Sequence, residues 1–149
     1  MRAASLIKAV LPPLTEHGDL PPGMHAAGWT EIEQRFGTGT QARVRALSTL
    51  KRVHELARRT GFLRNFYVFG SFVSSIPEPR DVDVVLIMSA NFRLEDCPSE
   101  SQPLFWHLQA EARYGASVFW FKEGTASKQY LRGWQLKRDG TLRGIVEVA

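Results

Sequence analysis

Phe66-Tyr-Val-Phe-Gly-Ser-Phe72 and Asp81-Val-Asp-Val-Val-Leu-Ile87 are the two stretches that decide the fold of this chain. Aromatic and β-branched residues dominate both, which is typical of strands. A Gly-Ser pair ends the first stretch, and the segment between the two contains Pro77 and Pro79. The pattern therefore predicts a strand, a Gly-Ser turn, a loop and a second strand.

The second predicted strand begins with two carboxylates. Because side chains alternate along a strand, Asp81 and Asp83 project to the same face, roughly 6.5 to 7 Å apart along the backbone. Hard cations such as Mg²⁺ take oxygen ligands of this kind and share them with substrate phosphates. Gly70 allows a phosphate to approach the backbone closely, and the amide and hydroxyl of Ser71 can donate hydrogen bonds to it. The two stretches together predict a site for Mg²⁺ or Mn²⁺ and a phosphate group.

Each half of this pattern also has a purely structural explanation. An Asp that follows a Pro-rich loop is often a turn residue, and Gly-Ser is a common turn dipeptide. Asp83, however, is predicted to lie inside a strand of Val, Leu and Ile, where an unpaired carboxylate is costly. The joint pattern therefore favours a functional site over two unrelated turns.

The hydrophobic-Gly-Ser pattern followed by a hydrophobic-flanked Asp-x-Asp resembles the nucleotidyltransferase superfamily related to DNA polymerase β. The resemblance implies an α/β (α+β) fold with a small mixed β-sheet flanked by helices. It also implies that Asp81 and Asp83 bind Mg²⁺ and contribute to catalysis. Gly70 and Ser71 are then expected to hold a nucleoside triphosphate.

Three further segments resemble a family of small bacterial proteins with nucleotidyltransferase-like cores. They are Leu20-Pro-Pro-Gly-Met-His25, Arg138-Asp-Gly-Thr and Arg143-Gly-Ile-Val. Small stand-alone members of the superfamily often occur in toxin–antitoxin or phage-defence pairs, so this resemblance implies a partner protein or an RNA acceptor. His25 is interpreted as a structural residue.

The chain departs from the superfamily pattern at the strand predicted over residues 116–121. Active members usually carry a third carboxylate on that strand, whereas this sequence offers Ser117. Glu123 follows the end of the strand and Glu111 precedes it on a helix. Glu123 is the substitute acid that we expect, because it directly follows the strand. Two-metal phosphoryl transfer needs cations held roughly 3.5 to 4 Å apart, so the missing carboxylate puts catalysis in doubt.

Length and composition indicate one compact domain, because the chain has 149 residues and 44% apolar content. We expect an N-terminal arm over residues 1–29, with a short helix in the first ten residues, and a globular domain over residues 30–149. Helices are predicted from a Thr30 cap to Phe36, from a Thr40 cap to Thr60, and from Pro103 to Tyr114. A last short strand is predicted over residues 144–148.

Charge and cysteine content indicate which partners and which cell compartment to expect. The net charge is +4, from 19 basic and 15 acidic residues, which mildly favours phosphate-bearing partners. The single cysteine, Cys97, excludes an internal disulfide framework. No apolar run approaches the length of a membrane span, and residues 1–10 lack the features of a secretory signal, so we expect a cytoplasmic protein without membrane contacts.

These observations leave two hypotheses of different classes. The first is a minimal nucleotidyltransferase that passes a nucleoside monophosphate from a nucleoside triphosphate to a hydroxyl of protein or RNA with Mg²⁺. The second is a catalytically inactive module of the same fold that binds a nucleotide or a partner protein. The sequence does not identify the base, the acceptor, the partner or the oligomeric state.

Overall fold

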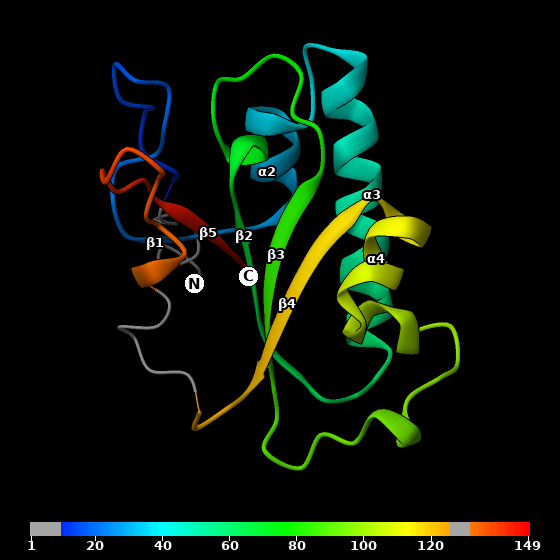
Figure 1. Cartoon of the computed structure of the whole chain (residues 1–149). Coiled ribbons are helices and arrows are strands. Elements are labelled where there is room, and N and C mark those ends of the chain that lie inside the picture. The colour runs from blue at the N-terminus through cyan, green and yellow to red at the C-terminus, as the bar shows by residue number, and fades with distance from the viewer. Residues whose placement is uncertain (1–9, 126–131) are drawn as a thin grey trace, which may run out of the picture.

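The protein folds into one mixed β-sheet with its helices packed on one face, as the sequence predicts (Figure 1). The computed structural model describes residues 10–125 and 132–149. The helix expected in the first ten residues falls on 1–9 and so lies outside the described residues, apart from Val10. Among the described residues, no helix is long and apolar enough to cross a membrane.

Short 3-10 helical turns, labelled η, connect some of the helices and strands. In order, the elements are β1 Met24–Ala27, α2 Trp29–Phe36, α3 Gln41–Arg58, β2 Leu63–Phe69, η1 Ser71–Val73, β3 Val82–Met88, η2 Leu94–Asp96, η3 Gln102–Phe105, α4 His107–Tyr114, β4 Ala116–Lys122 and β5 Ile145–Val148.

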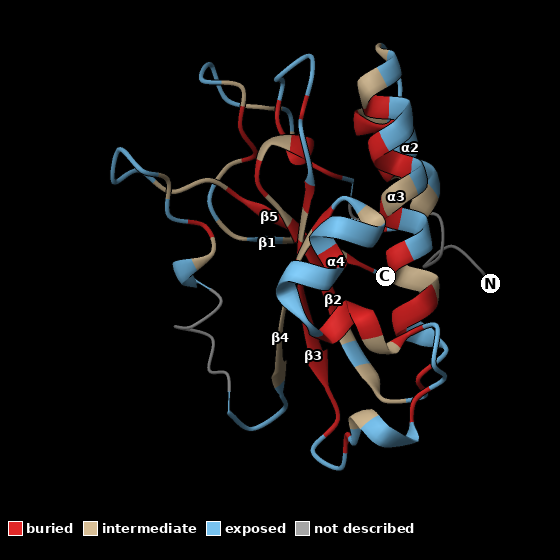
Figure 2. Ribbon diagram, turned by 45° about the vertical axis from the view of Figure 1, so that its right-hand side comes forward, coloured by how far each residue is buried: buried red, intermediate tan, exposed pale blue. Residues whose placement is uncertain are grey.

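The sheet has the strand order β1-β5-β2-β3-β4. β2 is antiparallel to both β3 and β5, whereas the pairs β3/β4 and β1/β5 are parallel. β3 contains the Val-Asp-Val-Val-Leu-Ile run of the second sequence stretch, and it is buried along almost its whole length (Figure 2). Its Val, Leu and Ile side chains pack into apolar clusters on both faces of the sheet, which explains why they do not alternate with polar residues.

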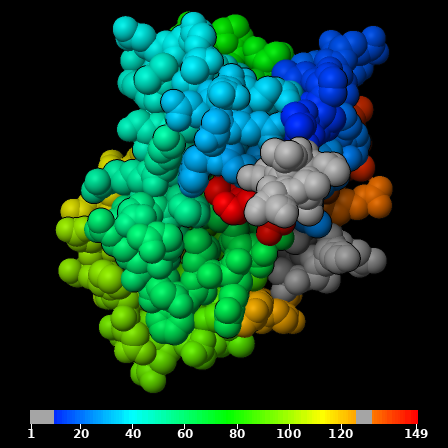
Figure 3. Space-filling view, turned by 180° about the vertical axis from the view of Figure 1, so that it is seen from behind, coloured from blue at the N-terminus to red at the C-terminus, as the bar shows by residue number. Residues whose placement is uncertain are grey.

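The main core lies between the sheet and the helices. α3 contributes its predicted apolar stripe, which consists of Ala46, Leu47, Leu50, Val53 and Ala57. Viewed from behind, α2 and α3 cover this face of the sheet (Figure 3). The opposite face carries a smaller cluster, formed by Tyr67, Val85, Ile87 and Ile145 with Phe69, Phe119, Phe121 and Trp134 packed against them.

The predicted N-terminal arm is part of the domain. Met24–Ala27 pairs with β5 in parallel, and the side chains of Leu11 and Leu20 are buried in the main core. The boundary expected after residue 29 is therefore wrong. Local sequence does not predict β1, because β1 is an edge strand whose one neighbour in the sheet, β5, lies at the other end of the sequence.

Two helix predictions need correction. α2 begins after Gly28 and has no side-chain cap, so Thr30 lies inside its first turn instead of capping it. The helix predicted over residues 103–114 is interrupted at Trp106, whose φ of −114° and ψ of 107° are extended. In the helix that follows the break, Ala110 is buried and Leu108 is 78% exposed.

Candidate functional site

The end of β2 and the beginnings of β3 and β4 meet at the same end of the sheet. In the antiparallel pair, Phe69 lies opposite Asp83, and in the parallel pair Asp83 lies beside Ser117. Figure 1 shows these strand ends together in the upper half of the molecule, below the loop that joins η1 to β3. The sheet register thus brings together three sequence-predicted residues, Gly70, Ser71 and Asp83, and places Asp81 directly before β3.

Asp83 is the carboxyl group of this cluster whose pKa the fold raises. It lies on the sheet face away from α3, because Val85 and Ile87, which follow it at the same alternation, belong to the smaller cluster. Burial and then the negative charge of Asp81, with a smaller contribution from Glu111, raise the pKa of Asp83 to about 6, while Ser117 and the charge of Arg143 oppose the increase. A carboxylate that resists ionisation in this way gains stability when a cation binds to it.

Gly70 packs its backbone directly against this carboxylate. Its φ of 81° lies in the left-handed region, and a Cβ atom at this position would stand only 2.2 Å from Asp83 Oδ2. Both observations require glycine here. Within the described residues, neither the amide nor the hydroxyl of Ser71, which follows, donates a hydrogen bond to a protein acceptor. The turn therefore presents two unused donors beside a carboxylate.

We expect Gly70→Ala to lower the free energy of unfolding by about 1 to 3 kcal/mol, from backbone strain and from the contact with Asp83. Gly61→Ala is the matched control, because Gly61 has a similar φ of 78° but nothing within 4 Å of the added Cβ. Thermal unfolding with and without Mn²⁺ measures both effects. Gly70→Ala should also weaken Mn²⁺ stabilisation. Equal losses in both variants would show that the Asp83 contact contributes nothing.

The structure brings Glu111, not Glu123, toward the cluster. Ser117 Oγ donates a long hydrogen bond of 3.5 Å to Glu111 Oε2, and the other oxygen of Glu111 pairs with His107 Nε2, also at 3.5 Å. Ser117 thus lies between Asp83 and the carboxylate of Glu111. The carboxylate of Glu111 comes from α4 and approaches the cluster from outside the sheet.

Glu123 lies at the opposite end of β4. Its amide donates to Met88 O, at the end of β3, and its carboxylate accepts from the amide of Ala90 and pairs with Arg64. At the rise of a strand, this position is about 20 Å from the level of Ser117. The expectation that Glu123 replaces the missing carboxylate is therefore wrong. Ser117 and Asp83 lie at the beginning of their strands, whereas Glu123 follows the end of β4.

The residues present fit a single hard cation better than a complete two-metal centre. Within the described residues, no three His, Cys, Asp or Glu side chains converge closely enough to hold one metal ion. Asp83 lies against the Gly70–Ser71 turn, whereas Asp81, two residues earlier and exposed, lines a cavity beside α3. Mg²⁺ is commonly bound by one or two protein carboxylates, with waters and substrate phosphates completing its shell.

Comparison with known protein families matches residues 12–149 to a family of unknown function, DUF6932. The chain belongs to this family. The match begins within the segment that had been expected to be an arm, in agreement with the structural role of Leu20 and β1 in the domain. No curated protein and no solved structure matches the chain.

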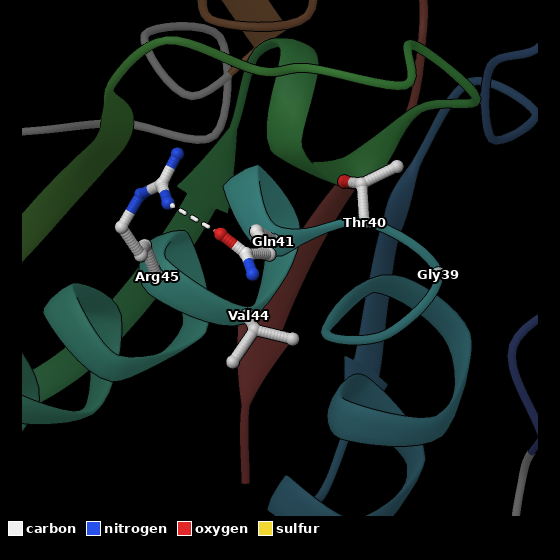
Figure 4. Close-up of a pocket in the computed structure, with 5 residues that line it drawn as sticks. All are labelled: Gly39, Thr40, Gln41, Val44 and Arg45. Atoms are coloured by element: carbon white, nitrogen blue, oxygen red, sulfur yellow. Dashed lines mark hydrogen bonds between the residues drawn. The ribbon is translucent and has the colours of Figure 1, made fainter.

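Two cavities adjoin the start of α3. One, of about 250 Å³, is lined mainly by α3 and by the residues that lead into β3, including Arg45, Arg80 and Asp81. The other is shown in Figure 4 and is lined by Gly39, Thr40, Gln41, Val44 and Arg45. Its only charged side chain, Arg45, is hydrogen-bonded to Gln41 at 3.4 Å. The first cavity therefore reaches a residue of the carboxylate cluster, and the second does not.

Arg43 holds the loop between the Gly-Ser turn and β3, and the sequence analysis did not single it out. Its guanidinium is buried and donates to four backbone carbonyls: those of Phe36, Phe72, Ser74 and Ile76. Burial lowers its pKa. The interruption of the apolar stripe of α3 by an arginine one turn before Leu47 is the only sequence signal that could have indicated this role.

Proposed function

We propose that this protein is a minimal nucleotidyltransferase, which transfers a nucleoside monophosphate from a nucleoside triphosphate to a hydroxyl of protein or RNA in the presence of Mg²⁺ or Mn²⁺ and releases pyrophosphate. The observation that carries the proposal is the close approach of the Gly70 backbone to the carboxylate of Asp83, beside Ser71 donors that no described residue uses. A turn that donates to phosphate and a partly buried carboxylate, Asp83, with Asp81 two residues before it, are complementary to a metal-bound triphosphate. Such a substrate implies a cytoplasmic setting.

Each residue has a distinct role in this proposal. Asp81 and Asp83 would hold the cation, and the absence of a side chain at Gly70 would let a phosphate lie against the backbone. The amide and hydroxyl of Ser71 would donate to its oxygens. A bound Mg²⁺ neutralises phosphate charge and polarises the phosphoryl group toward attack.

Glu111 is the residue placed to accept the proton of the acceptor hydroxyl. Its carboxylate is half-exposed, so an incoming acceptor can reach it, and its contact with Ser117 keeps it beside the cluster. His107 pairs with the other oxygen and restrains the orientation of the carboxylate. A base at this position acts from α4 instead of from the strand, so its contribution is smaller than that of a carboxylate shared with the metal.

Glu111→Gln is expected to lower nucleotidyl transfer by about 10- to 100-fold, because removal of a positioned base costs rate without removing the metal ligands. Glu123→Gln, the matched control, should leave transfer unchanged. The measurement uses nucleoside triphosphates labelled at the α-phosphate, Mg²⁺ or Mn²⁺, and cell extract as the source of acceptor.

Wild-type protein that binds neither Mn²⁺ nor any of the four nucleoside triphosphates in a calorimetric titration would refute the proposed function. Transfer that is lost in Glu123→Gln but retained in Glu111→Gln would refute the assignment of the base.

One observation favours a second candidate, the inactive module. Ser117 lies directly beside Asp83, at the position where a carboxylate shared with the metal is expected. In that case the protein would bind a nucleotide and a partner without turnover. Ser117→Asp distinguishes the two: transfer that is absent in the wild type and appears in this variant would show a retained binding site without a catalyst.

A further inference from the structure

The N-terminal and C-terminal segments interlock beside the Gly-Ser turn. The amide of Gly144 donates to Leu20 O at 2.8 Å, and the amide of Ile145 donates to Gly23 O at 3.0 Å. In return, the amide of Gly23 donates to Gln135 Oε1 at 2.7 Å. Two segments at opposite ends of the sequence, 20–25 and 138–146, therefore form one local structure, which lies at the left of Figure 1.

This structure places Arg143 alongside the predicted phosphate turn. In the antiparallel pair of β5 and β2, Tyr67 lies opposite Glu147 and Val68 opposite Val146. Asp19, which forms an ion pair with Arg143, also forms an isolated β-bridge with Ser74, three residues after Ser71. Arg143 also shares the alternation of Ile145, which belongs to the cluster on the sheet face of Asp83. The positive charge of Arg143 acts on the Asp83 carboxyl, so the two groups lie near each other.

Asp19 fixes two cations in this region. Its carboxylate is almost fully buried and pairs with Lys137 Nζ at 2.7 Å and with Arg143 Nη1 at 3.6 Å. A buried carboxylate without partners would be strongly unfavourable, so the two cations are held together by the fold. Their side chains are only partly exposed, which reduces the entropy that they would lose on binding a ligand.

The same cations line a cavity of about 480 Å³, together with Leu136, Arg138 and Asp139. The lining also contains one acid, Asp139, whose Oδ1 accepts from both the amide and the hydroxyl of Thr141. Arg138 is exposed and has no ion-pair partner among the described residues. The cavity therefore presents three cations and one acid, and the pairing of Arg143 with Asp19, which bridges to Ser74, connects it to the loop after the Gly-Ser turn.

We propose that the cavity lined by Lys137, Arg138 and Arg143 binds the polyphosphate group of the nucleotide, with Asp19 positioning Lys137 and Arg143. This inference rests on the proposed function and deepens it. The phosphate nearest the sugar lies at the turn and the carboxylates, and the outer phosphates extend toward the cavity. Arginine suits this role because its planar fork can donate two parallel hydrogen bonds to phosphate oxygens.

The test is calorimetric titration of the full chain with inorganic tripolyphosphate and, separately, with Mn²⁺ alone. The variants are Arg138→Gln, Arg143→Gln and the control Arg58→Gln, each of which removes one positive charge. Arg58 is exposed and pairs with Glu55 on α3, away from the cavity. We expect about a tenfold loss of tripolyphosphate affinity in the first two variants and none in the control. Mn²⁺ affinity should not fall in any of them, because a cation near the metal site opposes metal binding.

The outcomes separate this inference from the proposed function. Arginine-dependent binding of tripolyphosphate without any Mn²⁺ binding would support the cavity and refute nucleotidyl transfer. Wild-type binding of Mn²⁺ and nucleotide that is unaffected in both cavity variants would refute the cavity and leave the function standing. Equal losses in all three variants, or no binding of tripolyphosphate to the wild type, would also overturn the inference. Arg138→Gln keeps the test decisive if Arg143→Gln fails to fold, because Arg138 makes no ion pair with a described residue.

Discussion

Arg43→Ala is expected to lower the free energy of unfolding by about 3 to 5 kcal/mol, the largest loss that we predict for a single substitution. The buried guanidinium donates to four carbonyl oxygens at 2.5 to 3.0 Å, and alanine would leave these without a partner. Since a domain of this size is stable by only about 5 to 15 kcal/mol, the variant should unfold well below the wild-type melting temperature.

Arg45→Ala is the matched control for this substitution. Arg45 lies two residues further along α3 but is exposed, and among the described residues it is hydrogen-bonded only to Gln41. Its loss should change stability by less than about 0.5 kcal/mol. Arg43→Lys should recover only part of the lost stability. A lysine ammonium cannot donate to all the carbonyls that Nη1 and Nη2 of the guanidinium reach. Chemical denaturation measures all three. Equal stability of Arg43→Ala and Arg45→Ala would mean that the loop before β3 is held without the guanidinium.

The parts of the fold that local sequence determines were predicted from the sequence. The stripe at Ala46, Leu50 and Val53 follows the period of a helix, and the Thr40 side chain accepts from the amide of Arg43, as expected for a cap. β3 and the Gly70 turn were likewise indicated by β-branched runs and by a glycine at the point where the chain adopts a positive φ. In each case the physical cause lies within a few residues of the signal.

The parts that depend on long-range pairing could not be predicted in this way. The burial of Arg43 depends on carbonyls about thirty residues away, and the position of Arg143 depends on the register of β5 with β2. The choice between Glu111 and Glu123 shows the same limit. Both lie near β4 in sequence, but only the parallel register of Asp83 with Ser117 determines which end of the strand faces the site.

Asp83→Asn is expected to have opposite effects on stability and on binding. In the metal-free protein it should raise the free energy of unfolding at pH 7 by about 1 to 2 kcal/mol. The pKa of Asp83 rises from 3.8 to about 6 on folding, because of burial and then of the charge of Asp81. The full shift would correspond to about 3 kcal/mol. We expect a smaller gain, because Asp83 is partly exposed and solvent screens its charge.

The pH dependence follows from the direction of this shift. A carboxyl whose pKa is raised by folding binds its proton more tightly in the folded state than in the unfolded state. Wild-type stability should therefore fall as the pH rises from 3.8 to about 6, and remain lower above that range. Asp83→Asn lacks the titrating group and should not show this fall. Thermal unfolding in the presence of a chelator, measured from pH 4 to pH 8, compares the two proteins.

Metal should reverse the order of stability. Saturating Mn²⁺ with a nucleoside triphosphate is expected to stabilise the wild type by mass action and to leave Asp83→Asn almost unaffected, since an amide is a much weaker ligand than a carboxylate for a hard cation. We expect the affinity for metal-bound nucleotide to fall by about 1,000-fold, equivalent to about 4 kcal/mol. Asp96→Asn is a suitable control, because Asp96 is exposed and lies at the opposite end of the sheet, in the loop after β3.

The combination of the two effects is what identifies a functional carboxylate. A residue kept only for the fold would make the protein less stable when replaced, whereas Asp83 is held in an environment that opposes its ionisation, against the backbone of Gly70. If Asp83→Asn is less stable than the wild type without metal at pH 7, Asp83 has a structural role and the site loses its main support. If the variant is more stable but the wild type gains nothing from Mn²⁺ and nucleotide, the strain is real and the cation assigned to it is wrong.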